Sequence, residues 1–420
     1  MSEIEAGLIR NMAIKAKRAA EPLAATPSAV KNNVLLSVVD LLEKNKERIQ
    51  RENSKDLEVA RAKGLSSAMI DRLELTDDVI KSMITGLREV VALPDPVGEV
   101  FDMARRPNDM TVGRMRIPLG VIGMIYESRP NVTIDAAALC LKTGNAIILR
   151  GGSEAINSNI VLSEVLQEAL AENNINADAV QVIPTIDREA INELLSQDDL
   201  IDLIIPRGGE GLIRFVAENS KVPVLKHYKG VCHIYVDKDA DLAKATPIII
   251  NSKTQRPGVC NALEGLLVDK TVAESYLPEI SNHLAKAGVE LLGCGEAVRL
   301  SKSISLAKDD DWGTEFLDLK LCIKVVESFS EAKEYILEHG SQHTEVILTE
   351  NYSTAQQFIR EIDASGVFVN VSTRFNDGGQ LGLGTEIGIS TTKLHAYGPM
   401  GLRELTTSKF IVYGEGQVRE

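Results

Sequence analysis

One segment of the chain places a cysteine where it could act as a nucleophile. Cys260 follows a Pro-Gly pair, which favours a tight turn, and residues 247–250 before that turn form an apolar run that we expect to be a strand. Two cations, Lys253 and Arg256, lie between the run and the cysteine. Nearby positive charge lowers the pKa of a thiol and increases the fraction of thiolate, which is the nucleophilic form. By itself, the segment fits a buried structural cysteine slightly better, because free cysteines are commonly buried.

Two further segments could bind a phosphate group. Each has Arg-Gly-Gly at the end of a predicted strand and before a predicted helix, and the two stretches are Arg150-Gly151-Gly152-Ser153 and Arg207-Gly208-Gly209-Glu210. Glycine at such a turn lets an anion approach the backbone N–H groups of the helix N-terminus. The same glycines would also make a tight turn without a ligand, but two turns that each carry an arginine favour a nucleotide. Neither segment has the GxGxxG pattern of an ordinary dinucleotide site.

The composition of the chain limits its class. With 420 residues, of which 44% are hydrophobic and 25% charged, it is typical of a soluble protein of two or three domains. The net charge of −14 argues against a nucleic-acid partner. The five cysteines include no CxxC pair and the six histidines show no metal-ligand spacing, so we predict neither disulfides nor a metal. The acidic N-terminus lacks a signal-peptide core and no apolar run approaches a membrane span, so we expect a cytoplasmic protein without membrane contact.

The elements that would position these residues alternate between helix and strand over most of the chain. The predicted regions are helices over 1–95 (one of them spanning 71–91), a β-hairpin over 97–118, alternating strands and helices over 119–235, a second α/β unit over 236–370, a glycine-rich loop region over 371–402 and a strand within 405–413. Near-continuous apolar strands between helices indicate parallel sheets that are covered on both faces. The exposed edges of the hairpin favour a partner subunit that covers them.

Several of these segments resemble the aldehyde dehydrogenase superfamily. They are residues 118–133, 144–152, 251–261, 372–375 and 398–402, which follow one another along nearly the whole chain. The resemblance implies an α/β fold with two Rossmann-like parallel-sheet domains and a small β element for oligomerisation. It implies an NADP-binding domain over 1–235 that returns at 380–402, a catalytic domain over 236–379, and an oligomerisation element over 97–118 and 403–420.

Within the superfamily, the segments are similar to the branch that reduces L-glutamyl 5-phosphate to L-glutamate 5-semialdehyde and phosphate in proline biosynthesis. The resemblance implies that Cys260 attacks the acyl carbon, expels phosphate and holds the acyl group as a thioester. It also implies that the Asn131 side chain and the Cys260 backbone N–H stabilise the negative charge that develops on the acyl oxygen. Asn131 could equally serve as a helix N-cap, alone or in addition.

The resemblance implies a bound nicotinamide cofactor. Arg150 ends its predicted strand at a position that suits an adenosine 2′-phosphate, so we expect NADPH rather than NADH. The turns Gly151-Gly152-Ser153 and Arg207-Gly208-Gly209-Glu210 are assigned to the cofactor, the second of them near its pyrophosphate. Glu315 matches the glutamate that holds the nicotinamide ribose, although a surface acid is an alternative interpretation. Lys253, Arg256 and Arg374 are the candidate cations for the substrate's anions, with Arg129 as a weaker candidate.

One departure from the superfamily pattern bears on the reaction. Hydrolytic members carry a Glu-Leu-Gly-Gly-Lys segment whose glutamate activates water, whereas the corresponding stretch here is His227-Tyr228-Lys229-Gly230. Without that carboxylate, the thioester should exchange with phosphate and escape hydrolysis. His227 could replace the base, but a lone histidine is more often structural.

Other interpretations stay open at this point. The chain could be another acylating aldehyde dehydrogenase, linked to a different acyl phosphate or to coenzyme A, or a catalytically inactive scaffold on the same fold. The resemblance implies a homodimer or homotetramer. A contact with glutamate 5-kinase, the preceding enzyme of the pathway, is not decided by the sequence.

Overall fold

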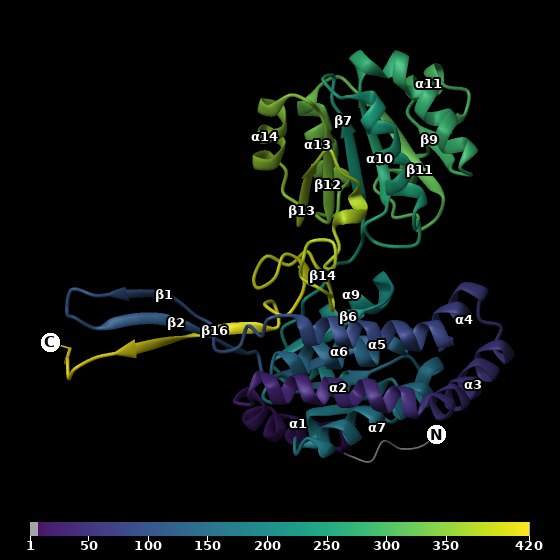
Figure 1. Ribbon diagram of the computed structural model, residues 1–420. Helices are drawn as coiled ribbons and strands as arrows, with labels where there is room; N and C mark the ends of the chain where they lie inside the picture. The colour runs from purple at the N-terminus through teal and green to yellow at the C-terminus, as the bar shows by residue number, and fades with distance from the viewer. Residues whose placement is uncertain (1–6, 420) are drawn as a thin grey trace. The chain divides into compact units, whose positions relative to one another are not determined.

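The computed structural model describes residues 7–419 and divides the chain into two compact units (Figure 1). The first unit comprises Met1–Lys226, Leu383–Gly388 and Met400–Glu420, and the second comprises His227–Gly382 and Ile389–Pro399. The acidic N-terminal residues 1–6 lie outside the described part. The division falls before strand β7 (Cys232–Val236), whereas the sequence placed it at residue 235, because β7 joins the sheet of the second unit.

The first unit begins with a helical layer, as expected. Its helices are α1 (Leu8–Ala24), α2 (Ser28–Lys44), α3 (Lys46–Ala62), α4 (Ser67–Leu73) and α5 (Asp77–Ala92). The helical stretch predicted over 71–91 is interrupted, because α5 starts anew after Thr76. The Thr76 hydroxyl accepts a hydrogen bond from the backbone N–H of Val79 at 3.2 Å and so caps the new helix.

A parallel sheet forms the centre of the first unit. Its strands, in the order β5-β4-β3-β6, are β3 (Val121–Tyr126), β4 (Ala146–Arg150), β5 (Val180–Val182) and β6 (Leu203–Arg207). The connecting helices are α6 (Asn131–Lys142), α7 (Ile156–Glu172), α8 (Glu189–Leu195) and α9 (Glu210–Asn219). Ile125 pairs with Arg150 and Tyr126 with Arg207, so both predicted arginines lie at the carboxyl edge of the sheet. The strand expected over 222–225 is reduced to a single bridge at Val224.

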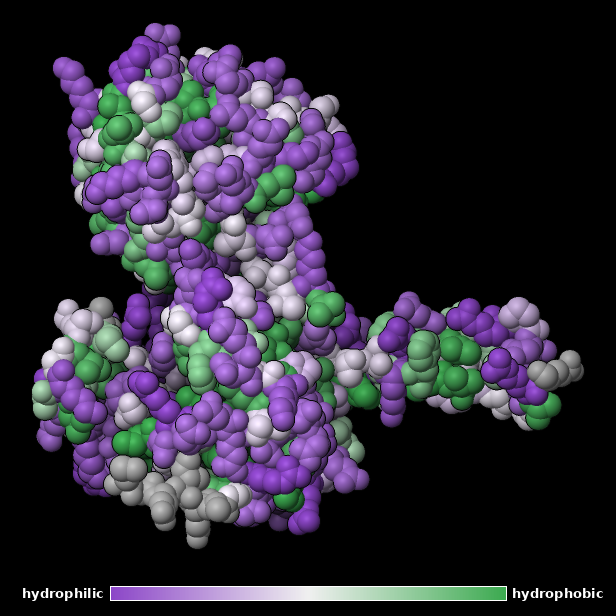
Figure 2. Space-filling view, turned by 180° about the vertical axis from the view of Figure 1, so that it is seen from behind, coloured by the Kyte–Doolittle hydropathy of each residue, from purple (hydrophilic) through white to green (hydrophobic). Residues whose placement is uncertain are grey.

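Three antiparallel strands extend from this unit as an arm (Figure 1). They are β1 (Val100–Arg105), β2 (Thr111–Pro118) and β16 (Thr406–Tyr413), with β2 in the centre. The hairpin and the C-terminal strand therefore combine as predicted, from Thr406 opposite Pro118 to Tyr413 opposite Thr111. Figure 2 shows apolar side chains gathered along the arm. Among them, Phe410 is 67% and Tyr413 is 64% exposed in the single chain.

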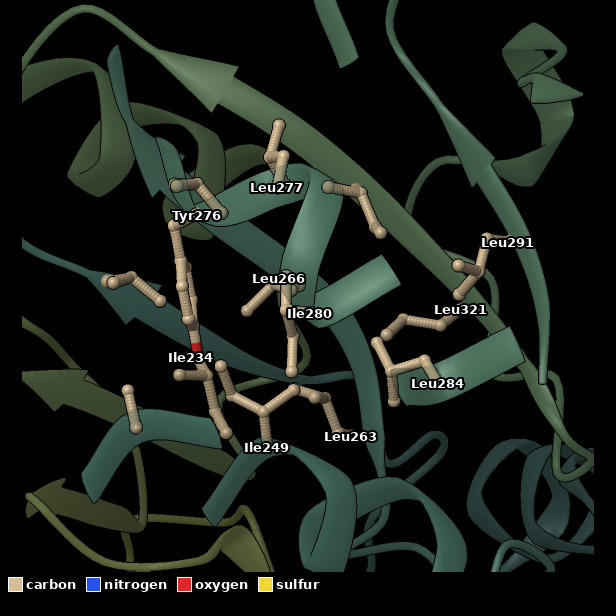
Figure 3. Packing of buried hydrophobic residues seen from close by; sticks show 14 of the residues in the cluster. Ile234, Ile249, Leu263, Leu266, Tyr276, Leu277, Ile280, Leu284, Leu291 and Leu321 are labelled. Atoms are coloured by element: carbon tan, nitrogen blue, oxygen red, sulfur yellow. The ribbon is translucent and has the colours of Figure 1, made fainter. Parts of the chain in front are cut away.

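The second unit is built on a seven-stranded parallel sheet. Its order is β10-β9-β11-β8-β7-β12-β13, with β8 (Leu263–Asp269), β9 (Glu290–Gly293), β10 (Ile304–Leu306), β11 (Lys320–Val326), β12 (Thr344–Leu348) and β13 (Gly366–Val369). Its helices are α10 (Leu242–Thr254), α11 (Lys270–Lys286), α12 (Gly295–Leu300), α13 (Phe329–His339) and α14 (Tyr352–Glu361). Ile234 and Leu266 pack with α10 and α11 (Figure 3), whereas their neighbours Tyr235 and Leu267 pack with α13 and α14. Helices therefore cover both faces.

The apolar run before Cys260 is helical, so its prediction as a strand is wrong. Residues 247–250 lie within α10, which starts where the Asp241 carboxylate accepts hydrogen bonds from two backbone N–H groups of the first turn. Ala245, Ile249 and Ser252 are buried at helical spacing, a period that the short run could not reveal. The glycine-rich region after β13 holds a short 3-10 helix, η4 (Thr373–Phe375), and two brief strands, β14 (Gly388–Ser390) and β15 (Gly398–Met400).

Candidate active site

Cys260 lies half-buried in the loop between α10 and β8, and its backbone is tightly held. The buried Cys232 thiol donates to the Cys260 carbonyl oxygen at 3.2 Å. Gly230 packs directly on the same backbone, since a Cβ added there would lie 2.0 Å from the Cys260 oxygen and 2.5 Å from its Cα. Only glycine fits this position without a shift. The loop therefore presents the thiol from a fixed backbone.

Two histidines lie beside the Cys260 thiol. Their ligating nitrogens and the Cys260 Sγ all lie within 4.8 Å of one another, and the residues are His227 and His343. The Nδ1 of His227 is 2.7 Å from the carbonyl oxygen of Ile389. Because a carbonyl only accepts hydrogen bonds, Nδ1 carries the proton, and Nε2 of the neutral ring is an acceptor.

The sheet topology explains why these three residues meet. His227, Cys260 and His343 each come shortly before a strand, and those strands are β7, β8 and β12. The three strands are neighbours in a parallel sheet, so their amino ends lie at one edge. The three residues are far apart in the chain, so local spacing could not indicate this cluster. The strand order would have revealed it, together with the rule that parallel strands start at the same edge.

Two of the three predicted substrate cations, Arg374 and Arg256, lie near each other, and Arg374 lies near Cys260. Arg374, on η4, donates from Nε to the Gln255 side chain at 2.8 Å. Partial burial lowers the pKa of Arg374, and so does the neighbouring charge of Arg256, whereas Asp377 and Cys260 raise it. Arg374 therefore lies near both Arg256 and Cys260.

Lys253, the third predicted substrate cation, is buried in an ion pair. Its ammonium is fully buried and forms an ion pair with Glu264 at 2.7 Å, where the Glu264 side chain is also fully buried. Burial lowers the pKa of Lys253 and raises that of Glu264 to about 7, while the attraction between the two groups opposes both changes. The pair links α10 to β8 on either side of the Cys260 loop. The other Glu264 oxygen accepts from the backbone N–H of Leu317 at 3.3 Å. The pair therefore has a structural role, and the role of Lys253 toward the substrate stays a prediction.

A pocket of about 530 Å³ opens beside Arg150 in the first unit. Gly152, Ser153 and the exposed Arg188 also line it. The Arg150 guanidinium donates to the carbonyl oxygens of Gly151 at 2.8 Å and Ile186 at 3.4 Å, while its buried Nε lacks a hydrogen-bond partner among the described residues. Arg188 was not identified from the sequence, because it follows a different strand, β5, from the one that Arg150 ends.

The second Arg-Gly-Gly turn differs from the first, because a carboxylate already engages it. The backbone N–H of Gly209 donates to Glu127 at 2.9 Å. Arg207 ends β6, and Glu210 forms an ion pair with Arg214 at 2.6 Å. Among the described residues, the lining of the 530 Å³ pocket does not include the Gly208–Glu210 part of this turn.

Asn131 is the first residue of α6, and its side chain turns along the helix. Its amide donates to Asp135 at 3.0 Å, and burial raises the pKa of Asp135 to about 6 although Asn131 and Arg207 lower it. The residue before it, Pro130, occupies the N-cap position, so the interpretation of Asn131 as the cap is not met. Glu315, half-buried in the second unit, lies close enough to Glu264 to raise the pKa of Glu264.

Comparison with known proteins decides the family. A family model described as "Aldehyde dehydrogenase family" matches residues 1–292. The chain belongs to the aldehyde dehydrogenase family. It is therefore an oxidoreductase of that family, and the predicted fold of two parallel-sheet units is confirmed. No helix within residues 7–419 has both the length and the apolar character that a membrane span requires.

Relatives within the aldehyde dehydrogenase family match this chain over its full length. A protein of Desulfotalea psychrophila named "Gamma-glutamyl phosphate reductase" is 63% identical over 411 residues, which cover 98% of each chain. A protein of Maridesulfovibrio salexigens with the same name is 55% identical over 420 residues and 100% of each chain. The crystal structure of gamma-glutamyl phosphate reductase from Thermotoga maritima has a TM-score of 0.96 at 48% identity, covering 98% of this chain and 100% of that one.

Proposed function

We propose that the protein reduces L-glutamyl 5-phosphate to L-glutamate 5-semialdehyde and phosphate with NADPH, as a step of proline biosynthesis. The observation that carries the proposal is a half-buried cysteine on a fixed loop, near Arg374, in a chain whose full-length relatives are named gamma-glutamyl phosphate reductase. A thiol near Arg374, which itself lies near Arg256, suits a substrate that carries a phosphate on its reacting carbon, because guanidinium groups bind phosphate.

Cys260 is the nucleophile in this proposal. The unprotonated Nε2 of His227 accepts the proton of the thiol, while the hydrogen bond from Nδ1 to Ile389 holds the ring in that tautomer. The thiolate attacks the acyl carbon, the carbon–oxygen bond to phosphate breaks, and the acyl group stays on sulfur as a thioester. When bound, NADPH supplies the hydride that reduces the thioester carbon. The sulfur–carbon bond then breaks, which releases the aldehyde and restores the thiolate.

Negative charge develops on the acyl oxygen in each of these steps. We assign its stabilisation to the Cys260 backbone N–H and the Asn131 amide, each worth about 3–4 kcal/mol where such a donor is well placed. Asn131 donates to Asp135 in this structure, so the proposal requires the amide to exchange partners or to share its second N–H. The stretch at His227-Tyr228-Lys229-Gly230 brings no carboxylate that would activate water, which supports exchange of the thioester with phosphate.

The first unit supplies the groups for a nicotinamide cofactor. Arg150 ends β4 at the carboxyl edge of a parallel sheet, where open α/β sheets bind dinucleotides. Its buried Nε, which has no hydrogen-bond partner within residues 7–419, and the neighbouring Arg188 suit an additional phosphate, which supports NADPH over NADH. Gly152 and Ser153 line the pocket beside Arg150, and Gly151 stays assigned to the cofactor with them. A pyrophosphate at Gly208-Gly209 would have to displace Glu127 from the backbone N–H of Gly209. Glu315 stays assigned to the nicotinamide ribose.

The arm is the proposed contact for a homodimer or homotetramer. Its outer strands β1 and β16 each leave one edge unpaired among the described residues, and apolar side chains of β16 are largely exposed. Monomeric proteins usually protect such edges. For a contact with glutamate 5-kinase, the support is only that this kinase is the preceding enzyme of the proposed pathway.

The test measures enzyme activity with two acyl acceptors, phosphate and coenzyme A, and in two cysteine variants. We expect the purified protein to form NADPH from L-glutamate 5-semialdehyde and NADP when phosphate is present, and we expect Cys260→Ser to abolish this while leaving thermal unfolding unchanged. Cys294→Ser, which changes a half-buried cysteine elsewhere in the same unit, is the control and should keep wild-type activity. Retained activity in Cys260→Ser would refute the thioester. Faster turnover with coenzyme A would favour a different acylating dehydrogenase, and no turnover with either acceptor would favour an inactive scaffold.

A further inference from the structure

We propose that His227, Cys260 and His343 form a binding site for one soft divalent cation, for which Zn²⁺ is the best fit. Occupation of the site would capture the thiolate that the reaction needs and inhibit the enzyme reversibly. The metal site follows from the geometry of the cluster alone. Its inhibitory effect rests on the proposed function, because that function makes Cys260 the nucleophile.

The donor atoms suit zinc in type and position. One thiolate and two imidazoles are the set that zinc and similar soft cations prefer over magnesium or calcium. The three atoms lie within 4.8 Å of one another. With bonds of about 2.3 Å to sulfur and about 2.0 Å to nitrogen, tetrahedral zinc needs them roughly 3.3–3.6 Å apart. Any two of these atoms that lie as far as 4.8 Å apart would therefore have to move closer together when the ion binds.

The groups around the cluster orient both histidines as metal ligands are oriented. Metal-bound histidine usually forms a hydrogen bond from its second ring nitrogen to a carbonyl or other polar group, which fixes the ring. His227 does so with the carbonyl oxygen of Ile389 at 2.7 Å. The Nδ1 of His343 lies 2.7 Å from the Thr344 hydroxyl. The fourth position of a tetrahedral ion stays open for water or an anion, as in zinc sites with three protein ligands.

Nearby cations limit the affinity. Arg374 lies near Cys260, with Arg256 next to Arg374, and their positive charge repels a dication, so we expect binding weaker than in a structural zinc site. The same arginines favour an anion such as phosphate as the fourth ligand. Replacement of Arg374 by glutamine removes one repulsive charge and should strengthen Zn²⁺ binding, an effect opposite to that of losing a ligand.

The site is tested by titrating the full-length, metal-free protein with ZnCl₂ in a calorimeter and with CoCl₂ in a spectrophotometer. We expect one ion per chain and, with cobalt, a thiolate charge-transfer band. Cys260→Ser should remove that band, and His227→Gln and His343→Gln should each weaken binding at least 100-fold, since even outer-shell changes cost 10–100-fold. His343 is buried, so the half-buried His227 provides the variant that is more certain to fold. Cys294→Ser should bind as the wild type does.

Each outcome bears on the proposal. Absence of one-to-one Zn²⁺ binding in the wild type would overturn the proposal. A Zn²⁺ affinity equal to that of the wild type in both His227→Gln and His343→Gln would also overturn it, because the thiol alone would then hold the ion. Inhibition that a chelator reverses, and protection of Cys260 from iodoacetamide by Zn²⁺, would support it. If the reductase assay fails while zinc still binds with the expected ligand dependence, the metal site stands and the proposed function falls.

Discussion

Replacing Gly230 by alanine tests how the Cys260 loop is held. The added Cβ would lie 2.0 Å from the Cys260 carbonyl oxygen and 2.5 Å from its Cα, and both contacts are to backbone that cannot rotate away. Restoring an ordinary contact of 3.4 Å requires the Cys260 backbone to retreat by about 1.4 Å. A displacement of about 1 Å in a reacting group can lower turnover about 100-fold. Overpacking of this kind also costs about 1–3 kcal/mol of stability.

The assay for Gly230→Ala measures three quantities. We expect kcat with phosphate and NADP to fall about 100-fold, the alkylation rate of Cys260 by iodoacetamide to change, and the free energy of unfolding to fall moderately. Gly211→Ala is the control, because a Cβ at this helical glycine has open space around it and should leave kcat unchanged. Wild-type kcat and alkylation in a folded Gly230→Ala protein would refute the view that Gly230 fixes the nucleophile.

Three further predictions concern stability and assembly. Lys253→Met should lower the free energy of unfolding, measured by urea titration, by about 3–5 kcal/mol, because it leaves Glu264 unpaired in the interior. Adding Glu264→Gln to Lys253→Met should recover part of that loss. Burial raises the pKa of Asp135 to about 6, so this carboxyl binds a proton more tightly in the native protein than in the unfolded chain. The free energy of unfolding of the wild type, measured relative to that of Asp135→Asn, should therefore fall by at most about 3 kcal/mol as pH rises from 4 to 7. A difference between the two proteins that stays constant over this pH range would contradict the prediction. Phe410→Lys on the exposed arm should shift sedimentation toward monomer while thermal unfolding of each chain persists.

The alternation of strand and helix could be predicted because the buried strands are short, apolar and separated by amphipathic helices. The failures occurred where a short run hides its period. Residues 247–250 contain three consecutive isoleucines, which fit a strand as well as a buried helix face, and only the longer spacing through Ser252 shows the helix. The signal for the start of α5 is also short, because it consists of Thr76 followed by two aspartates. This pattern is typical of a helix N-cap and could have been recognised from the sequence.

Charge on a residue could be predicted from the sequence, but its accessibility could not. Lys253 and Arg256 occupy the same segment, yet the first is fully buried against Glu264 and the second is exposed. The partner of Lys253 lies on the following strand, beyond the turn, so the pair forms only once α10 packs on β8. Arg188, by contrast, reaches the Arg150 pocket from a different strand-to-helix connection, and its neighbourhood depends on the order of the sheet.

The two units place their reactive residues at opposite ends of their strands, and this explains which of them the sequence could reveal. Arg150 and Arg207 follow β4 and β6, where the carboxyl edge of an open α/β sheet is the expected ligand site. Cys260, His227 and His343 instead precede β8, β7 and β12 and meet at the amino edge. A search that follows strands to their carboxyl ends finds the arginines and misses the histidines. Because each member of the cluster lies in the segment that leads into a separate strand of one parallel sheet, the strand order brings the three segments to the same edge, which favours a preorganised thiol.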